Sequence, residues 1–247
     1  MTVPVTCTII AMNEADRIGR AIRSVAGLVA EVLVVDSGST DGTQDIARSH
    51  GARVVFNPWS GFGPQKRFAE DAAKHDWILN LDADEWLGDD LRAELQALLA
   101  GADLPARCFR MKMTMVYPGR EKPCPLADYH NYVRLYDRRA TRFADSLVHD
   151  EVAATTDARQ LQAPALHQSF RSLSHVVRKE LDYYALQKRE LRKRPLALAL
   201  RLPFEFPLQF LKFYLLRHHI LGGAYGLALS LVIAFMRWLR LLVLLGW

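Results

Sequence analysis

The chain has 247 residues, of which 50% are hydrophobic, and its formal net charge is +5. This length can bury one sizeable core, or one core with a short additional module. The three cysteines show no CxxC spacing, which argues against a disulfide framework and against a zinc site. No basic segment precedes the first short apolar stretch, so we expect no signal peptide and a cytoplasmic protein.

Strands and helices are predicted to alternate through residue 100. The predicted strands cover residues 3–11, 31–35, 53–56 and 77–81, and the predicted helices cover residues 17–25, 65–73, 91–99 and a segment from 41 toward 50. Alternation of this kind predicts an α/β fold with a mixed, mainly parallel sheet flanked by helices. From residue 108 to 116, apolar and polar side chains alternate, as in an edge strand or a strand of a mixed sheet.

Three of the predicted strands end in polar or acidic side chains. These are Asn13 and Glu14 after the first strand, Asp36 after the second, and Asp82 and Asp84 after the strand at residues 77–81. In open α/β sheets, ligands bind in the crevice at the carboxyl ends of the strands. Two carboxylates at i and i+2 suit Mg²⁺ or Mn²⁺ when substrate phosphates complete the coordination shell, although a solvated acidic turn is the alternative.

Three motifs follow one another along residues 1–90: Asn13-Glu14, VVDSGSTDGT at residues 34–43, and LDADE at residues 81–85. Together they resemble the motifs of family 2 glycosyltransferases, which have the GT-A fold, a Rossmann-like sheet. The segment GFGPQKRF at residues 61–68 is similar to a narrower group that extends the inner core of bacterial lipopolysaccharide, typified by the heptose β-1,4-glucosyltransferase. No glycine-rich dinucleotide fingerprint or Walker lysine loop is present in the sequence.

The resemblance implies a metal site. Asp84, with help from Asp82, would hold Mg²⁺ or Mn²⁺ on the diphosphate of the donor. His167 falls where related enzymes place a histidine near the metal and the diphosphate. His149 would bind the metal or orient the catalytic base, and a purely structural histidine is an equal alternative.

The resemblance also implies a nucleotide-sugar site, which comprises Asn13, Glu14, Asp36, Ser37, Lys66, Arg67 and Asp82. Carboxylates accept hydrogen bonds from N–H and hydroxyl groups but repel phosphates, so Asp36 and Glu14 are expected to bind the uracil and the ribose. Lys66 and Arg67 would neutralise the diphosphate of the leaving group. The alternative for these two cations is a solvent-facing pair on an amphipathic helix.

Inverting transfer to a hydroxyl group requires a carboxylate base on the acceptor side. The segment at residues 143–151 resembles the position where many family 2 members carry His-Glu, but this chain has His-Asp-Glu there. The assignment is therefore ambiguous by one residue. We expect Asp150 to be the base, with Glu151 and Asp145 as the alternatives.

The composition changes near residue 195. Beyond it the chain is rich in Leu, Phe and Ala, and its charged residues are Arg201, Lys212, Arg217, Arg237 and Arg240 against the single acid Glu205. Cations beside apolar helices attract anionic lipid surfaces. Because glycines and arginines interrupt the apolar surface, a helix in the membrane interface is favoured over a spanning helix. A helical cap on the core and a dimer interface are alternatives, and the apolar content argues against nucleic acid.

We therefore expect a catalytic domain at residues 1–194, with a nucleotide-sugar half (1–100) and an acceptor half (101–194), and a membrane-associating tail at residues 195–247. The expected function is inverting transfer of a hexose, in particular glucose from UDP-glucose, to a lipid-linked saccharide such as the lipopolysaccharide inner core. The protein would lie on the cytoplasmic face of the inner membrane. The alternatives are transfer to polyprenyl phosphate or another glycolipid, and an inactive membrane-associated scaffold; homo-oligomerisation stays open.

Overall fold

The structure is a computed structural model that describes residues 3–101, 103–144, 151–190 and 195–246. It divides into two compact units. The first unit consists of Met1–Thr114 and Tyr129–His167, and the second consists of Met115–Asp128 and Gln168–Trp247. The candidate site residues described below belong to the first unit.

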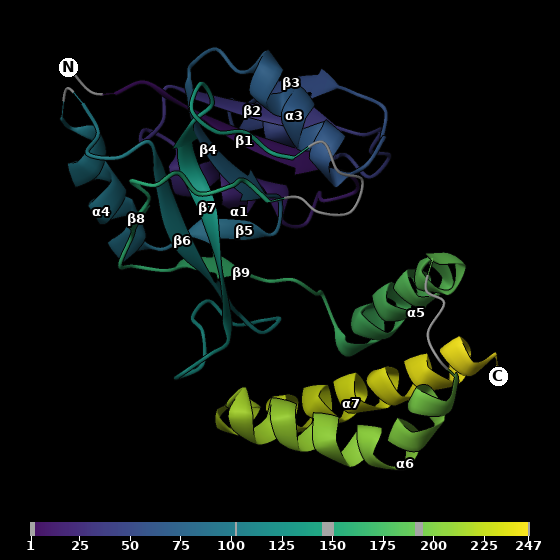
Figure 1. The fold of residues 1–247 in the computed structure, drawn as a ribbon. Coiled ribbons are helices and arrows are strands. Elements are labelled where there is room, and N and C mark those ends of the chain that lie inside the picture. Colours follow the sequence, from purple (N-terminus) through teal and green to yellow (C-terminus); the bar gives the residue numbers. More distant parts are fainter. Residues whose placement is uncertain (1–2, 102, 145–150, 191–194, 247) are drawn as a thin grey trace. The chain divides into compact units, whose positions relative to one another are not determined.

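The first unit is built on a mixed sheet (Figure 1). Its parallel part consists of β3 (Arg53–Phe56), β2 (Glu31–Asp36), β1 (Val5–Ala11) and β4 (Trp77–Asp82), in this spatial order. The antiparallel part follows with β7 (Tyr129–Asp137), β6 (Cys108–Met115), β9 (Ala165–His167) and β5 (Glu85–Leu87), while β8 (Arg159–Gln160) pairs with β6. The predicted mixed, mainly parallel α/β sheet is thereby confirmed.

Helices cover both faces of the parallel strands, which explains why these strands are apolar almost throughout. The helices are α1 (Ile18–Val25), α2 (Thr43–Ser49), α3 (Phe62–Ala72) and α4 (Asp89–Leu99). One core cluster joins α1, α2 and α4 to the sheet, through residues such as Ile22, Ala47 and Leu95. A second cluster joins α3 to strands β2, β4 and β7 through residues such as Ala69.

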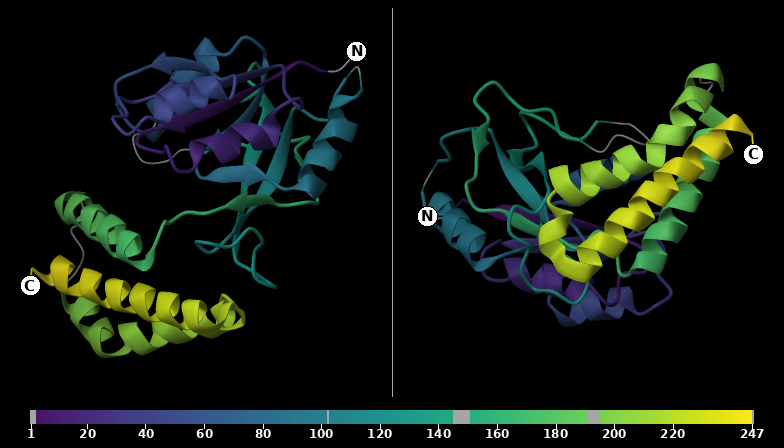
Figure 2. Two further views of the ribbon diagram at one scale, coloured as in Figure 1. Left: turned by 180° about the vertical axis from the view of Figure 1, so that it is seen from behind. Right: turned by 90° about the horizontal axis from the view of Figure 1, so that it is seen from below.

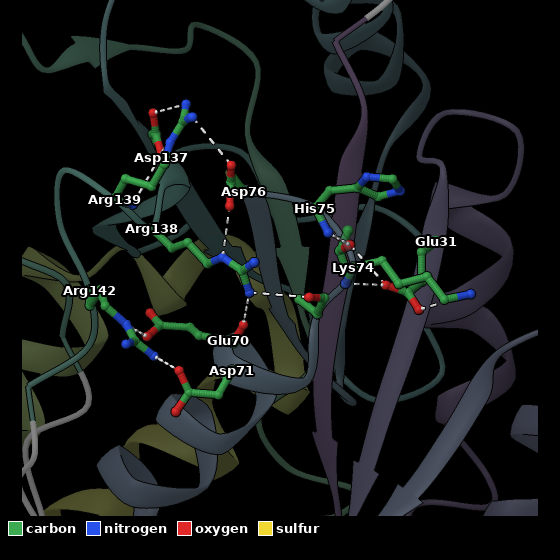
Figure 3. A network of polar contacts seen from close by, with 12 residues as sticks. Glu31, Glu70, Asp71, Lys74, His75, Asp76, Asp137, Arg138, Arg139 and Arg142 are labelled. Atoms are coloured by element: carbon green, nitrogen blue, oxygen red, sulfur yellow. Dashed lines mark hydrogen bonds and ion pairs between the residues drawn. The ribbon is translucent and has the colours of Figure 1, made fainter.

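The amino-terminal edge of the parallel strands is held by the ion pairs drawn in Figure 3. Asp76, which precedes β4, lies 3.2 Å from both Arg138 and Arg139. Asp137, at the end of β7, is buried and lies 2.8 Å from Arg139 and from Arg107. The Arg139 side chain lowers the pKa of Asp137 below its usual range, so this carboxylate stays ionised at neutral pH.

The second unit is helical. It contains α5 (Leu173–Glu190), α6 (Pro195–Leu211), a π-helical turn (Lys212–Leu216), a short 3₁₀ helix (His219–Gly222) and α7 (Gly223–Leu245). Helices α6 and α7 lie side by side, as Figure 2 shows. Tyr117, from the loop between β6 and β7, packs in a small core with Phe170, Val176 and Leu229.

The helical segment expected after residue 195 is therefore present as α6 and α7. Within the described part of the chain, one helical segment, His219–Leu245, is long and apolar enough to cross a membrane. Its mean hydropathy is 2.1, and 28% of its most apolar window is buried. Buried helices of soluble proteins can meet the same criterion of length and hydropathy.

Candidate active site

The carboxyl ends of β1, β2 and β4 meet at one edge of the sheet. Ala11, the last residue of β1, pairs with Asp36 on β2, and Ile10 pairs with Asp82 on β4. The loops that follow these strands therefore begin side by side. In parallel sheets this edge is where ligands bind, because loops and helix N-termini gather there.

The Asp36 carboxylate organises the loop that follows β2. It is fully buried and accepts hydrogen bonds from the backbone N–H groups of Gly38 and Ser39, both at 2.9 Å. The Ser39 hydroxyl and the Gln44 amide also donate to it, at 2.5 and 2.7 Å. Gly38 adopts φ +104°, which favours glycine over any residue with a side chain. Asp36 thus shapes this loop, and a contact of Asp36 with uracil stays a prediction.

Hydrogen bonds connect the loop after β1 to the loop after β2. Asn13, which itself has a positive φ, accepts a hydrogen bond from the Thr40 backbone at 2.9 Å. The backbone of Asn13 donates to the Ser39 hydroxyl at 2.9 Å, and the backbone of Glu14 donates to the Thr43 hydroxyl at 2.8 Å. The structure therefore brings Asn13, Glu14 and the loop after Asp36 together, as the strand order predicted.

Asp82 is held between two buried cations. The Lys66 ammonium lies 2.9 Å from its Oδ1 atom, and the Arg134 guanidinium lies 3.4 Å from its Oδ2 atom. Burial alone would raise the pKa of Asp82, but Lys66 and Arg134 outweigh this effect and lower the pKa strongly. Asp82 is therefore ionised at neutral pH.

The burial of Lys66 excludes one of the two roles that the sequence left open for it, that of a solvent-facing cation. Only 1% of its side chain is exposed, and its ammonium also lies 5.1 Å from the centre of the Phe143 ring. A solvent-facing role is therefore wrong for Lys66. Arg67 is half-buried and donates to the backbone carbonyl of Phe143 at 3.0 Å, so the two neighbouring cations have different surroundings.

Asp84 lies between an arginine and a histidine. Its Oδ2 atom is 3.3 Å from Arg17 and 3.5 Å from Nε2 of His167. Arg17 also donates two hydrogen bonds of 2.7 Å to the Glu14 carboxylate. His167 reaches this place because β9 pairs with β5, in a register that sets His167 opposite Glu85.

Asp84 and His167 each stabilise the charged form of the other. Burial would raise the pKa of Asp84, but His167 and Arg17 outweigh it, and the pKa falls below its usual value. Burial would lower the pKa of His167, but Asp84, Glu85 and Asp82 outweigh it, and the pKa rises. The side chain of Asp84 is 16% exposed, so the turn after β4 is not the solvated acidic turn that the sequence left as an alternative.

Asp84 and His167 fit a divalent metal ion as part of its ligand set. A carboxylate suits Mg²⁺ and Mn²⁺, and an imidazole is a common ligand of transition metals. Within the described residues, no group of three or more His, Cys, Asp or Glu side chains is arranged to hold an ion. The chain would thus supply two converging ligands, and phosphate oxygens of a substrate would complete the shell. Asp82 is less suited to ligation, because cations engage both of its oxygens.

Most of the residues predicted to provide or orient the catalytic base lie outside the described part of the chain. Asp145, His149 and Asp150 lie outside the described residues. Glu151 is described and exposed, and its backbone carbonyl accepts a hydrogen bond from the backbone of Ala144 at 3.3 Å. The choice among the three carboxylates stays a prediction.

Sequence reasoning missed Arg17 and Arg134, and it gave Glu85 only as part of the LDADE motif. Glu85 is 1% exposed and lies 2.7 Å from Arg134, which is itself 5% exposed. A signal for Arg134 was available, because it stands between the apolar residues Val133 and Leu135 of β7. Arg17 gave no such signal, since an arginine at the start of an amphipathic helix is common on protein surfaces.

A cavity of about 950 Å³ lies at the opposite, amino-terminal edge of the sheet. Lys74, Asp76, Arg107 and Asp157 are among the residues that line it. Its charges have both signs, and Asp76 and Arg107 already form ion pairs with neighbouring residues. The carboxyl edge, where Asp84 and His167 converge and a glycine-bearing loop follows β2, is therefore the better candidate for the active site.

Comparisons with known families and proteins show what the chain is similar to. The chain matches the family model described as Glycosyl transferase family 2 over residues 6–149. It is 36% identical over 248 residues to an uncharacterized glycosyltransferase of Rickettsia felis, covering 96% of this chain and 88% of the relative. Over 105 residues it is 40% identical to the lipopolysaccharide core biosynthesis glycosyltransferase LpsC of Rhizobium meliloti, covering 40% of this chain and 38% of LpsC. Among solved structures, S. aureus TarS 1-349 is similar with 17% identity, 75% and 64% coverage, and a TM-score of 0.48.

Proposed function

This chain belongs to glycosyltransferase family 2, and from that premise we propose that it is an inverting enzyme that transfers glucose from UDP-glucose to a lipid-linked saccharide. Membership of the family makes the chain a glycosyltransferase that uses a nucleotide sugar. The identity of the sugar, the stereochemical outcome, the metal and the acceptor are the parts that we propose.

The observation that carries the proposal is the charge arrangement at the carboxyl edge. Asp84 and His167 would hold Mg²⁺ or Mn²⁺, with the Asp84 carboxylate ionised at neutral pH. Bound there, the ion would stabilise the negative charge that grows on the departing diphosphate. Lys66, fixed by Asp82, supplies a second positive charge that needs no reorganisation during the reaction.

The proposed acceptor is the inner core of lipopolysaccharide. Two observations support it: the motif at residues 61–68, and the similarity to a protein named for lipopolysaccharide core biosynthesis over part of the chain. Residues 62–68 of this motif lie in helix α3, and its Lys66 binds Asp82 of the candidate site, which supports a role of the motif there.

The donor is tested by thermal unfolding with a panel of nucleotide sugars, with and without Mn²⁺. A ligand at 100 times its Kd stabilises the folded state by about 2.7 kcal/mol. We expect UDP-glucose with Mn²⁺ to raise Tm most. A larger effect of GDP-mannose would contradict the proposed donor, and no effect of any nucleotide sugar would contradict the proposed function.

The acceptor is tested by UDP release from UDP-glucose. We expect release with lipopolysaccharide inner core that lacks the added hexose, and none with polyprenyl phosphate. The reverse result would establish the alternative acceptor. Binding of the donor without release on any glycolipid would favour the inactive scaffold.

The base is tested with isosteric amides. If Asp150 is the base, Asp150→Asn should bind the donor normally and lose about 10²- to 10⁴-fold in turnover, because only proton transfer is removed. Glu151→Gln and Asp145→Asn should retain most activity. An active Asp150→Asn together with an inactive Glu151→Gln would move the base by one residue.

We further propose that the second unit attaches the enzyme to an anionic membrane surface, on the cytoplasmic face of the inner membrane. Helix α6 with its following turn, and helix α7, each carry large apolar side chains that are at least 40% exposed and spaced by three or four residues. These are Leu200, Phe204, Leu208, Leu211 and Leu215 on the first, and Leu227, Leu231 and Phe235 on the second. Such spacing aligns side chains along one stripe of a helix.

Charge in this unit also favours an anionic surface. Glu205 is buried and is bound by Arg201 at 2.9 Å, so it offers little negative potential outside. Lys212 lies on the turn after α6, which carries the first apolar stripe, and Arg237 and Arg240 lie on α7, which carries the second. Each cation near an anionic membrane contributes about 1 kcal/mol to binding.

Flotation with liposomes tests the attachment. Phe204→Ser with Leu208→Ser should abolish flotation with phosphatidylglycerol vesicles, because it removes apolar side chains that are already exposed. Trp59→Ser with Phe62→Ser is the matched control, since both aromatics are similarly exposed but belong to the first unit. Flotation of the Phe204/Leu208 variant at the wild-type level would contradict the proposal.

A further inference from the structure

Arg134 connects the strand that ends at Asp82 with the strand that begins at Glu85. Its guanidinium donates to the Asn80 side chain at 2.6 Å and to Glu85 at 2.7 Å, and it lies 3.4 Å from Asp82. Asn80 and Asp82 belong to β4, and Glu85 opens β5. One side chain from β7 therefore contacts oxygen atoms on both sides of the turn that carries Asp84, those of Asn80 and Asp82 before it and that of Glu85 after it.

Glu85 closes this arrangement from the other side. One of its oxygens binds Arg134, and the other accepts a hydrogen bond of 2.8 Å from the backbone N–H of Asp82. The turn from Asp82 to Glu85 is thus fixed both through the Asp82 side chain and through its backbone. Since His167 pairs with Glu85 in the β5–β9 ladder, the same contacts also fix the second candidate metal ligand.

The burial of Arg134 argues against a direct contact with substrate. Only 5% of the residue is exposed, and its guanidinium is engaged by three side chains. Burying an ion pair seldom adds stability compared with apolar side chains of similar volume. A buried ionic network at this edge is therefore better explained by the geometry that it enforces than by the stability that it adds.

We propose that Arg134 is a positioning residue that holds the Asp82–Glu85 turn so that Asp84 and His167 converge on one divalent metal ion. This inference rests on the proposed function, because it assumes that these two residues bind the metal of a nucleotide-sugar site. It assigns different tasks to the two aspartates. Asp82 is held in place by its ion pairs with Lys66 and Arg134, and Asp84 is the metal ligand.

The experiment measures the binding of Mn²⁺ by electron paramagnetic resonance, in the full-length protein with saturating UDP. Arg134→Lys keeps the positive charge but cannot reach Asn80, Asp82 and Glu85 together, because it lacks the planar fork of arginine. Loss of a group that orients metal ligands weakens metal affinity by about 10- to 100-fold. We expect a loss of this size for Mn²⁺.

Two further variants make the result specific. Arg138→Lys is the matched control: Arg138 likewise binds a carboxylate, that of Asp76, and two backbone carbonyls, but at the opposite edge of the sheet. It should bind Mn²⁺ like the wild type. Glu85→Gln removes the charge that Arg134 binds and preserves side-chain shape, so it should weaken Mn²⁺ binding even if Arg134→Lys does not fold.

The outcomes separate this inference from the proposed function. If the wild type shows no Mn²⁺-dependent binding of UDP, the proposed function fails. If the wild type binds Mn²⁺ and UDP, and Glu85→Gln and every folded Arg134 variant bind Mn²⁺ within twofold of it, the positioning role of Arg134 is overturned. An equal loss in Arg138→Lys would show a general loss of stability and would also overturn it.

Discussion

Asp82 and Asp84 are two residues apart on one turn, yet their surroundings give them different chemistry. Asp82 meets a cation at each oxygen, Lys66 at 2.9 Å and Arg134 at 3.4 Å. Asp84 contacts Arg17 at 3.3 Å and His167, itself a potential ligand, at 3.5 Å, and both contacts are made by its Oδ2 atom. A carboxylate with a cation at each oxygen is less suited to metal ligation than one whose contacts with Arg17 and His167 are made by a single oxygen. The individual contacts, and not the motif alone, therefore assign the roles.

At the residue scale, Glu31 makes stability depend on pH. Burial would raise the pKa of Glu31, but hydrogen bonds from the Lys74 backbone, from Arg53 and from Thr6 outweigh it, and the pKa is lowered. A carboxylate with a lowered pKa contributes stability above its unfolded pKa, about 4.3, and loses it as pH falls through the folded value. Glu31→Gln should therefore cost about 1–3 kcal/mol at pH 7.

Urea unfolding at pH 7 and at pH 3 measures this effect. The difference in unfolding free energy between wild type and Glu31→Gln should shrink as pH falls below about 4.3, the unfolded pKa of glutamate. Glu121→Gln, at an exposed position, should match the wild type at both pH values. A difference that stays constant between pH 7 and pH 3 would show that the Glu31 charge contributes nothing.

Single residues are also where sequence reasoning was weakest. Lys66 was assigned to the donor diphosphate from its motif; the structure shows its ion pair with Asp82, and its contact with the diphosphate stays a prediction. Arg134 carried no motif, and its contacts with Asn80 and Glu85 span 54 and 49 positions in the chain. Partners at such distances are decided by the sheet order, which hydrophobic periodicity does not specify.

At the element scale, the loop after β2 depends on the buried carboxylate of Asp36. Asp36→Ala would leave backbone and side-chain donors without their acceptor, at a cost of about 1–3 kcal/mol. We expect weaker UDP binding and a lower Tm, because the loop would lose its fixed shape. Asp45→Asn is the control, since Asp45 lies on α2 with 88% of its side chain exposed. Wild-type UDP affinity in Asp36→Ala, measured by calorimetry, would rule out this role of the loop.

The start of α7 depends on Gly226. A Cβ atom added there would lie 1.9 Å from the backbone oxygen of His219. Because this neighbour is backbone and cannot rotate away, Gly226→Ala should cost about 1–3 kcal/mol or more. Leu227→Ala, at the next and exposed position, should cost much less. Urea unfolding with limited proteolysis compares the two, and equal stabilities would contradict the close packing of the 3₁₀ helix on α7.

Elements were more predictable than residues, because periodicity reports local structure directly. The strands predicted at residues 31–35, 53–56 and 77–81 match β2, β3 and β4 to within one residue. The helix predicted from residue 65 instead begins at Phe62, ahead of Pro64. Proline in the first turn of a helix removes no hydrogen bond, so it did not mark the boundary.

At the scale of the whole molecule, the two compact units do not follow the chain order. Residues 115–128, from the middle of the chain, pack with the C-terminal helices, and Tyr117 lies 5.1 Å from Tyr225 between ring centres. A linear division of the sequence could not anticipate this. The division at residue 194 stays a prediction about membrane attachment, since α5 also belongs to the helical unit.

The central claim is that the carboxyl edge of the sheet binds a nucleotide diphosphate through a metal ion on Asp84. Calorimetric titration of UDP with and without Mn²⁺ tests it most directly, in the wild type, in Asp84→Asn and in Asp76→Asn. Asp76 serves as the control because its ion pairs lie at the opposite edge. We predict that UDP binding requires Mn²⁺, weakens at least about tenfold in Asp84→Asn and is unchanged in Asp76→Asn. UDP binding that persists in EDTA, or that is equal in Asp84→Asn and the wild type, would contradict the claim.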